Sequence, residues 1–211
     1  MQKSETPGGD IRSFSCAVIG EQSLLIQCCE QILARGHTIL AVVAESQRIR
    51  QWCNSAGLVC FNDVGDLASL PPFDYLFSIT NLKIVPATVL SLPLRMAINF
   101  HDGPLPRYAG LNVPVWALLN GEKEHGITWH QMDTGADTGP VLIARRFPIS
   151  EDETAFTLNV LCYQEGLDAF AELLRGLETS DLRSHPQDLN NRVYFSASKR
   201  PLSIAALTIS R

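Results

Sequence analysis

Residues 98–110 read Ile-Asn-Phe-His-Asp-Gly-Pro-Leu-Pro-Arg-Tyr-Ala-Gly, and residues 131–139 read Gln-Met-Asp-Thr-Gly-Ala-Asp-Thr-Gly. The apolar run at residues 96–98 is typical of a buried strand, and the period of two along a strand places Asn99 and His101 on the same side of its carboxyl end. In an open α/β sheet this end of the strands is where ligands bind. The proline and glycine residues that follow predict a stiff loop that holds both polar side chains in place.

Strands and helices alternate along the rest of the chain. Continuous apolar runs predict strands, and apolar residues at helical spacing predict the helices between them. The expected strands are residues 14–19, 37–44, 58–61, 74–79, 95–98, 126–132, 141–147 and, as a possible addition, 193–195. The expected helices are residues 22–34, 46–55, 86–91, 113–119 and a long amphipathic helix over 151–177. This alternation predicts an α/β fold with a doubly wound, mostly parallel sheet flanked by helices and joined by right-handed crossovers.

Length and composition favour one folded domain. The chain has 211 residues, of which 45% are hydrophobic and 18% charged, and this is enough for one sizeable core. We expect a mobile leader at residues 1–12, the folded domain at 13–177 and a short C-terminal extension at 178–211. The extension is rich in polar residues, and the leader is polar with two glycines.

Charge and cysteine content narrow the class of protein. The net charge of −5 argues against a broad surface that binds nucleic acid or an anionic membrane. Because no apolar run reaches the length of a membrane span, and residues 1–10 lack the core of a secretory signal, we expect a cytoplasmic protein. The six cysteines lack both the density of a disulfide framework and metal-ligand spacing, so we expect buried thiols and no metal site.

An Asn, a His and an Asp at one sheet edge suit acyl transfer from a donor amide to an amine. Asn99 can donate an N–H to the oxyanion of the tetrahedral intermediate, an effect of roughly 3 to 4 kcal/mol in comparable sites. His101 can move a proton between the attacking amine and the leaving nitrogen. Asp137 can orient this imidazole, favour its charged form, or hold a water or the incoming amine. With no Ser or Cys nucleophile placed beside His101, we expect direct transfer without a covalent enzyme intermediate.

At these residues the chain resembles the 10-formyltetrahydrofolate-dependent formyltransferases, whose shared core carries an Asn-x-His segment, a Leu-Pro loop and a downstream Asp-x-Gly. The resemblance covers about residues 14–177 and implies a Rossmann-like catalytic domain, 10-formyltetrahydrofolate as the formyl donor, and a catalytic trio of Asn99, His101 and Asp137. In that family the pteridine is held largely by backbone groups of two loops. The matching cofactor-binding residues here are Lys83, Ile84, Val85, Ala136 and Asp137. Plain core packing is the alternative for Ile84 and Val85.

The chain departs from the family pattern beside the site. The usual Pro-Ser after the histidine is replaced by Asp102-Gly103, which adds a carboxylate and a more permissive backbone. The candidates for contact with the acceptor are Asp102, Arg107 and Tyr108. The turn at residues 20–23 lacks a glycine-rich phosphate loop, so neither a ribonucleotide acceptor nor a nicotinamide dehydrogenase is expected.

The acceptor amine stays open among several possibilities. The motif at residues 101–112 and the segment at 194–201 look most like the formylation domains of natural-product assembly lines, where the acceptor is an aminoacyl group on a carrier protein. The acidic composition and the thirty-odd residues after the long helix disfavour tRNA. Alternatives are a sugar-nucleotide N-formyltransferase, a formyltetrahydrofolate hydrolase and a non-catalytic folate-binding module. His125 and His130 are interpreted as packed or solvated imidazoles.

Overall fold

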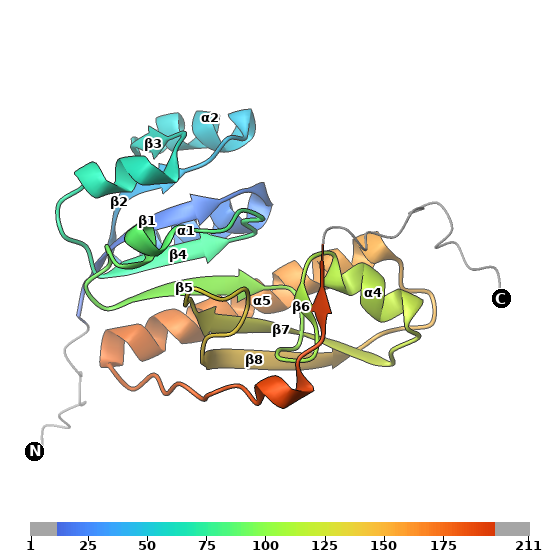
Figure 1. The fold of residues 1–211 in the computed structure, drawn as a ribbon. Helices are drawn as coiled ribbons and strands as arrows, with labels where there is room; N and C mark the ends of the chain where they lie inside the picture. Colours follow the sequence, from blue (N-terminus) through green and yellow to red (C-terminus); the bar gives the residue numbers. More distant parts are fainter. Residues whose placement is uncertain (1–11, 197–211) are drawn as a thin grey trace, which may run out of the picture.

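A seven-stranded sheet forms the centre of the computed structural model, which describes residues 12–196. Its strand order is β3-β2-β1-β4-β5-β7-β8 (Figure 1). The strands are β1 (Ser15–Gly20), β2 (Thr38–Val43), β3 (Cys60–Phe61), β4 (Tyr75–Ile79), β5 (Met96–His101), β7 (Glu124–Gln131) and β8 (Val141–Pro148). The first five run parallel, β7 pairs antiparallel with β5, and β8 pairs antiparallel with β7. The predicted mostly parallel α/β sheet is therefore confirmed. Apart from residue 12, the predicted leader lies outside the described residues, as do residues 197–211 of the extension.

Helices cover both faces of the sheet. The helices are α1 (Gln22–Ala34), α2 (Gln47–Ser55), α3 (Ala87–Leu90), α4 (Val113–Leu119) and α5 (Ala155–Thr179), with short 3-10 turns η1 (Val64–Ser69) and η2 (Leu189–Asn191). Side chains of α1, α2 and α5 form one large core with the sheet, and those of η1 and α3 form a second core on the opposite face. This is the two-sided covering that a parallel sheet requires.

Alternation along the strands explains the two cores. In β1, Cys16 and Val18 belong to the larger core, whereas Ala17 and Ile19 belong to the smaller one. All four side chains are buried, since successive residues of a strand point to opposite faces. The six cysteines are free, and all are buried except the half-buried Cys60, which confirms the expectation of packed thiols.

Helix α5 begins at Ala155, four residues later than the predicted start at residue 151. The Thr154 hydroxyl accepts a hydrogen bond from the Thr157 N–H, and the Thr157 hydroxyl accepts one from the Thr154 N–H. This reciprocal capping fixes the first turn at Ala155. Further along, Gly166 lies against Phe100 of β5, where an added Cβ would come within 2.4 Å of the ring. The helix therefore packs directly on the back of the strand that carries Asn99 and His101.

Strand β5 (Met96–His101) ends three residues later than predicted. It continues through His101 because β7 pairs with it, Asn99 opposite His130 and His101 opposite Thr128. This antiparallel neighbour was not expected from the doubly wound pattern. Its register brings the polar residues of two strands into one row.

The chain after α5 returns to the main body. Residues 183–196, which we name the C-terminal strap, run along β8 and end in β9 (Tyr194–Phe195), which pairs in parallel with β6 (Ala109–Gly110) (Figure 1). Backbone hydrogen bonds join His185 to Val141 in both directions at 2.8 Å. Within residues 12–196 no helix combines the length and apolarity that a bilayer crossing needs.

Candidate active site

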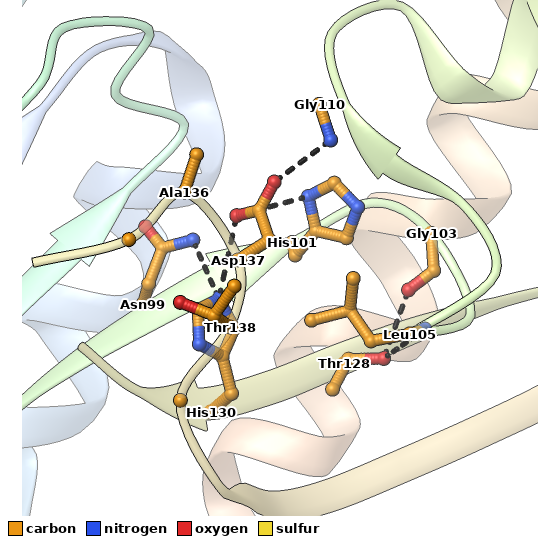
Figure 2. Close-up of polar contacts among 12 residues, drawn as sticks. Asn99, His101, Gly103, Leu105, Gly110, Thr128, His130, Ala136, Asp137 and Thr138 are labelled. Carbon is orange, nitrogen blue, oxygen red and sulfur yellow. Dashed lines mark hydrogen bonds and ion pairs between the residues drawn. The ribbon is translucent and has the colours of Figure 1, made fainter. Parts of the chain in front are cut away.

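Four polar side chains share one face of β5 and β7 at the edge of the sheet. Asn99 and His101 alternate with Phe100 on β5, and Thr128 and His130 alternate with Trp129 on β7. Phe100 and Trp129 pack against each other in the core beneath α5. Figure 2 shows the polar four together with Asp137, which approaches from the loop after β7. The structure thus brings together the three residues proposed as a catalytic trio and adds His130.

His101 is held by a backbone carbonyl. Its Nε2 lies 2.5 Å from the Tyr108 oxygen, and because a carbonyl oxygen only accepts, Nε2 carries the hydrogen. The other ring nitrogen, Nδ1, faces the Asp137 carboxylate, 3.8 Å from Oδ1. A side chain at Gly103 would collide with both the Tyr108 oxygen and the His101 ring. The tight loop is therefore part of what fixes the imidazole.

His130 holds the amide of Asn99. Its Nδ1 donates to the Gln131 carbonyl at 2.7 Å, so its Nε2 accepts from Asn99 Nδ2 at 3.1 Å. One amide hydrogen of Asn99 remains for an oxyanion. His130, interpreted from sequence as a packed or solvated imidazole, is buried, but its Nε2 faces the site. Residues 128 and 130 alternate along β7, so the sequence did indicate that Thr128 and His130 lie on the same face of that strand.

Asp137 is an ionised carboxylate at the centre of the site. Its Oδ2 accepts the Gly110 N–H at 2.8 Å, and its Oδ1 lies 3.6 Å from His130 Nε2. Burial alone would raise the pKa of Asp137, but the charge of His101 and the Gly110 N–H outweigh it and hold the pKa well below its usual range. The site therefore keeps a fixed negative charge beside the ring nitrogen of His101.

The two loops expected to bind folate lie at carboxyl ends of strands. The loop after β4 is braced by Asn81, whose side chain bonds both the N–H and the carbonyl of Lys83. The Lys83 ammonium pairs with Glu45 at 2.6 Å. Ile84 is 88% exposed, whereas Val85 is buried in the smaller core. Core packing thus accounts for Val85 but leaves Ile84 facing outward.

The second of these loops carries Ala136 and Asp137. Figure 2 shows Ala136 and Asp137 on the turn that follows β7. Asp137 itself has a φ of +55°, in the left-handed region, which ordinary residues adopt at a cost. The main chain of this turn therefore lies beside the polar row.

The three candidate acceptor-side residues lie in different surroundings. Asp102 falls on the α5 side of the strand, with its carbonyl bonded to His125 Nε2 at 2.8 Å, and burial raises the pKa of its carboxyl. Arg107 is exposed and pairs with Glu122 at 2.5 Å. Tyr108 is buried, and its carbonyl anchors His101.

Burial also lowers the pKa of His125 to about 4, so that histidine is a neutral, packed side chain, as expected.

A cationic groove borders the site loop, residues 102–110. It has a volume of about 540 Å³ and is formed by residues 105–107, Arg146 and residues 190–193. Its charged side chains are Arg107, Arg146 and Arg192, and no acidic residue lines it. Within the described part of the chain, no group of three or more His, Cys, Asp or Glu side chains is arranged to hold a metal ion.

Comparison with known proteins finds formyltransferases both by sequence and by fold. The chain is 39% identical over 106 residues to the methionyl-tRNA formyltransferase of Pelobacter propionicus, covering 50% of this chain and 33% of that protein. It is 30% identical over 192 residues to the enzyme of the same name from Anaeromyxobacter dehalogenans, covering 82% and 61%. The sugar 3N-formyl transferase WlaRD, solved with dTDP and 5-N-formyl-THF, shares the fold with a TM-score of 0.77 at 19% identity, covering 90% of this chain and 72% of that one.

The chain therefore spans between a third and two thirds of the length of these curated relatives. The Formyl transferase family matches residues 65–174, a segment that includes the whole polar row, the site loop and Asp137. Since this segment is more than half of the chain, the protein belongs to the formyl transferase family.

Proposed function

We propose that this protein transfers a formyl group from 10-formyltetrahydrofolate to a primary amine. The observation that carries the proposal is the convergence of Asn99, His101 and Asp137 at one sheet edge, with the nitrogen of His101 that faces Asp137 free of any backbone partner. The relatives named above carry formyltransferase activity in their names, and one was solved with a formylated folate.

The residues have complementary tasks in this reaction. The amine nitrogen attacks the formyl carbon, a C–N bond forms, and the carbonyl oxygen becomes an oxyanion that the free Asn99 N–H stabilises. His101 Nδ1 takes a proton from the amine and returns one to N10 of the folate as the old C–N bond breaks. The products are a formamide and tetrahydrofolate. Asp137 stabilises the imidazolium between these two transfers.

The donor would lie over the loop that carries Lys83, Ile84 and Val85. The outward-facing Ile84 offers apolar surface. The carbonyl oxygens of Lys83, Ala136 and Asp137 each accept one side-chain hydrogen bond and keep a second lone pair for a donor group of the folate. This combination suits a flat, polar-edged pterin ring. The donor would thus reach the polar row from the β4 side.

For the acceptor we propose an aminoacyl group tethered to a carrier protein, as in natural-product biosynthesis. Such a group is attached through a phosphodiester-linked arm, and the groove carries three arginines, Arg107, Arg146 and Arg192. Arg107 pairs with Glu122, Arg146 pairs with Glu124 at 2.8 Å, and Arg192 bonds the Ala136 carbonyl, so a phosphate would bind through their remaining N–H groups. A sugar nucleotide, which carries a diphosphate, is the second candidate, favoured by the same groove and by the dTDP-bound relative.

The test is incubation of the chain with 10-formyltetrahydrofolate and a panel of acceptors, monitored by release of tetrahydrofolate. The panel contains an aminoacylated carrier protein, a dTDP-amino sugar, a free amino acid and water alone. Release that depends on the carrier protein supports the proposal. Release with water alone indicates a hydrolase, and folate binding without release under every condition indicates a binding module.

A pair of neighbouring arginines tests the groove. Arg146→Met removes a groove cation, whereas Arg145→Met changes the next residue, which faces α5 and pairs with Glu165 and Glu172. We expect Arg146→Met to raise KM for the carrier-linked acceptor about tenfold, the loss of one charged hydrogen bond, and to leave KM for a free amine unchanged. Equal effects of the two substitutions would remove the phosphate role of the groove.

A further inference from the structure

We propose that the C-terminal strap is a working part of the active site, in which Gln187 and Arg192 are positioning residues for Asp137. The inference concerns where the carboxylate is held, and it rests on the proposed function for the role of Asp137 in catalysis. It extends the site to residues 187 and 192, past residue 174 where the family match ends.

Both carbonyls that flank Asp137 are bound by the strap. The Gln187 amide nitrogen donates to the Asp137 oxygen at 3.1 Å and to the Gly139 oxygen at 2.6 Å. An Arg192 guanidinium nitrogen donates to the Ala136 oxygen at 2.7 Å. Two side chains of the strap therefore fix the peptide groups before and after the residue that carries the carboxylate.

The turn needs this support because Asp137 adopts a left-handed conformation, with φ +55°. Such a conformation persists in a non-glycine residue when the surroundings impose it. Within the turn, Asp133 bonds the Gly135 N–H and the Thr138 hydroxyl, but neither bond reaches the two carbonyls next to Asp137. The strap supplies those contacts.

The strap also holds the opposite side of the carboxylate. Its strand β9 pairs with β6, and the Gly110 N–H at the end of β6 donates to Asp137 Oδ2. Gly110 has φ +99°, and an added Cβ would lie 2.2 Å from the Phe195 oxygen, so the two backbones are in direct contact. The Phe195 ring stacks between Tyr108 and Trp116, each with centroids 5.2 Å away. The strap thus contacts both the turn that carries Asp137 and the backbone of Gly110, whose N–H donates to the Asp137 carboxylate.

Four variants separate this role from general stability. Gln187→Glu keeps the length of the side chain but removes its donors, and Arg192→Met keeps the stem but removes the guanidinium. Arg192→Lys restores a donor for the Ala136 carbonyl. Arg183→Met is the control, because Arg183 is an exposed arginine of the same strap.

The first measurement needs no substrate. The Gly110 amide proton reports on Asp137 because its acceptor is the carboxylate. We expect its hydrogen exchange to accelerate about tenfold or more in Gln187→Glu and Arg192→Met, while the amides of β1 keep their exchange rates. Arg192→Lys and Arg183→Met should exchange like the parent protein. Unchanged Gly110 exchange in both donor-free variants overturns the inference, as does an equal acceleration across the whole sheet.

The second measurement is turnover with saturating substrates at a temperature where every variant is folded. Gln187→Glu should lower kcat roughly five- to twentyfold with KM for the amine within about twofold of the parent value, and Arg192→Lys should recover most of the kcat that Arg192→Met loses. A purely structural strap would lower the melting temperature and leave kcat unchanged. A parent protein that releases no tetrahydrofolate with any acceptor contradicts the proposed function, and the Gly110 exchange then still decides the inference about the strap.

Discussion

Removal of the His130 ring tests whether one imidazole serves catalysis by aiming the amide of Asn99. In the structure His130 Nε2 accepts from Asn99 Nδ2 at 3.1 Å, and its Nδ1 is fixed on the Gln131 carbonyl. His130 therefore acts on the oxyanion through Asn99. Three proteins form the experiment: Asn99→Ala, His130→Ala and the double variant.

The magnitudes follow from the number of contacts that each variant loses. Asn99→Ala removes the oxyanion donor and should lower kcat by about 10² to 10³. His130→Ala removes one neutral hydrogen bond, about 0.5–1.5 kcal/mol, or roughly two- to twelvefold in kcat. If His130 acts through Asn99, its removal costs nothing further once Asn99 is gone, so the double variant should match Asn99→Ala within about twofold.

The assay is single-turnover release of tetrahydrofolate with the best acceptor of the panel. The dissociation constant of 5-formyltetrahydrofolate, measured by fluorescence titration, serves as the control for donor binding. If the loss of kcat in the double variant equals the product of the two single losses, His130 does not act through Asn99. Its effect would then be exerted on Asp137, whose Oδ1 lies 3.6 Å from the same nitrogen.

Three other substitutions have outcomes that follow from the geometry. His101→Ala should abolish the pH dependence of transfer near neutrality, where imidazole titrates; a retained pH–rate profile means that another group moves the proton. For His125 the pKa is lowered from 6.5 to about 4 in the folded state, so its contribution to stability is complete above about pH 6.5 and is lost as the pH falls through about 4. His125→Gln keeps a donor for the Asp102 carbonyl but does not titrate, so the change in its free energy of unfolding between about pH 4 and 6.5 should be smaller than in the parent protein by up to about 3 kcal/mol. Urea titrations at several pH values check it. Gly166→Ala places a methyl group 2.4 Å from the Phe100 ring and should lower the free energy of unfolding by about 1–3 kcal/mol; an unchanged melting curve contradicts the close packing of α5 on β5.

The fold was accessible from sequence because its signals are local. Helix α1 spans residues 22–34, as its apolar spacing predicted, and the parallel strands are continuous apolar runs. The end of β5 was missed because Asn99 and His101 are polar and resemble the start of a loop. Pairing with β4 reaches Asn99, opposite Ser78, and the pairing with β7 carries the strand on to His101. A pairing partner about thirty residues away leaves no local trace.

The site residues divide in the same way: local spacing indicated some of them, and contacts between distant segments bring in the others. Alternation along one strand was enough to group Asn99 with His101. His130 joins them through an antiparallel register, Asn99 opposite His130, which a doubly wound parallel sheet does not suggest. Gln187 and Arg192 reach the turn of Asp137 across about fifty residues of chain, and no spacing rule predicts such contacts.

The reacting groups and the cationic groove are built from different parts of the molecule. Asn99, His101 and His130 project from the central strands. Seven of the eight groove residues come instead from two segments, 105–107 and 190–193, and the eighth, Arg146, comes from β8. Substitution in these segments can therefore alter which amine the proposed reaction admits, provided that Arg192, which holds the Ala136 carbonyl, is kept. Exchange of the remaining groove residues between members of the family is accordingly a practical route to redirect the choice of acceptor.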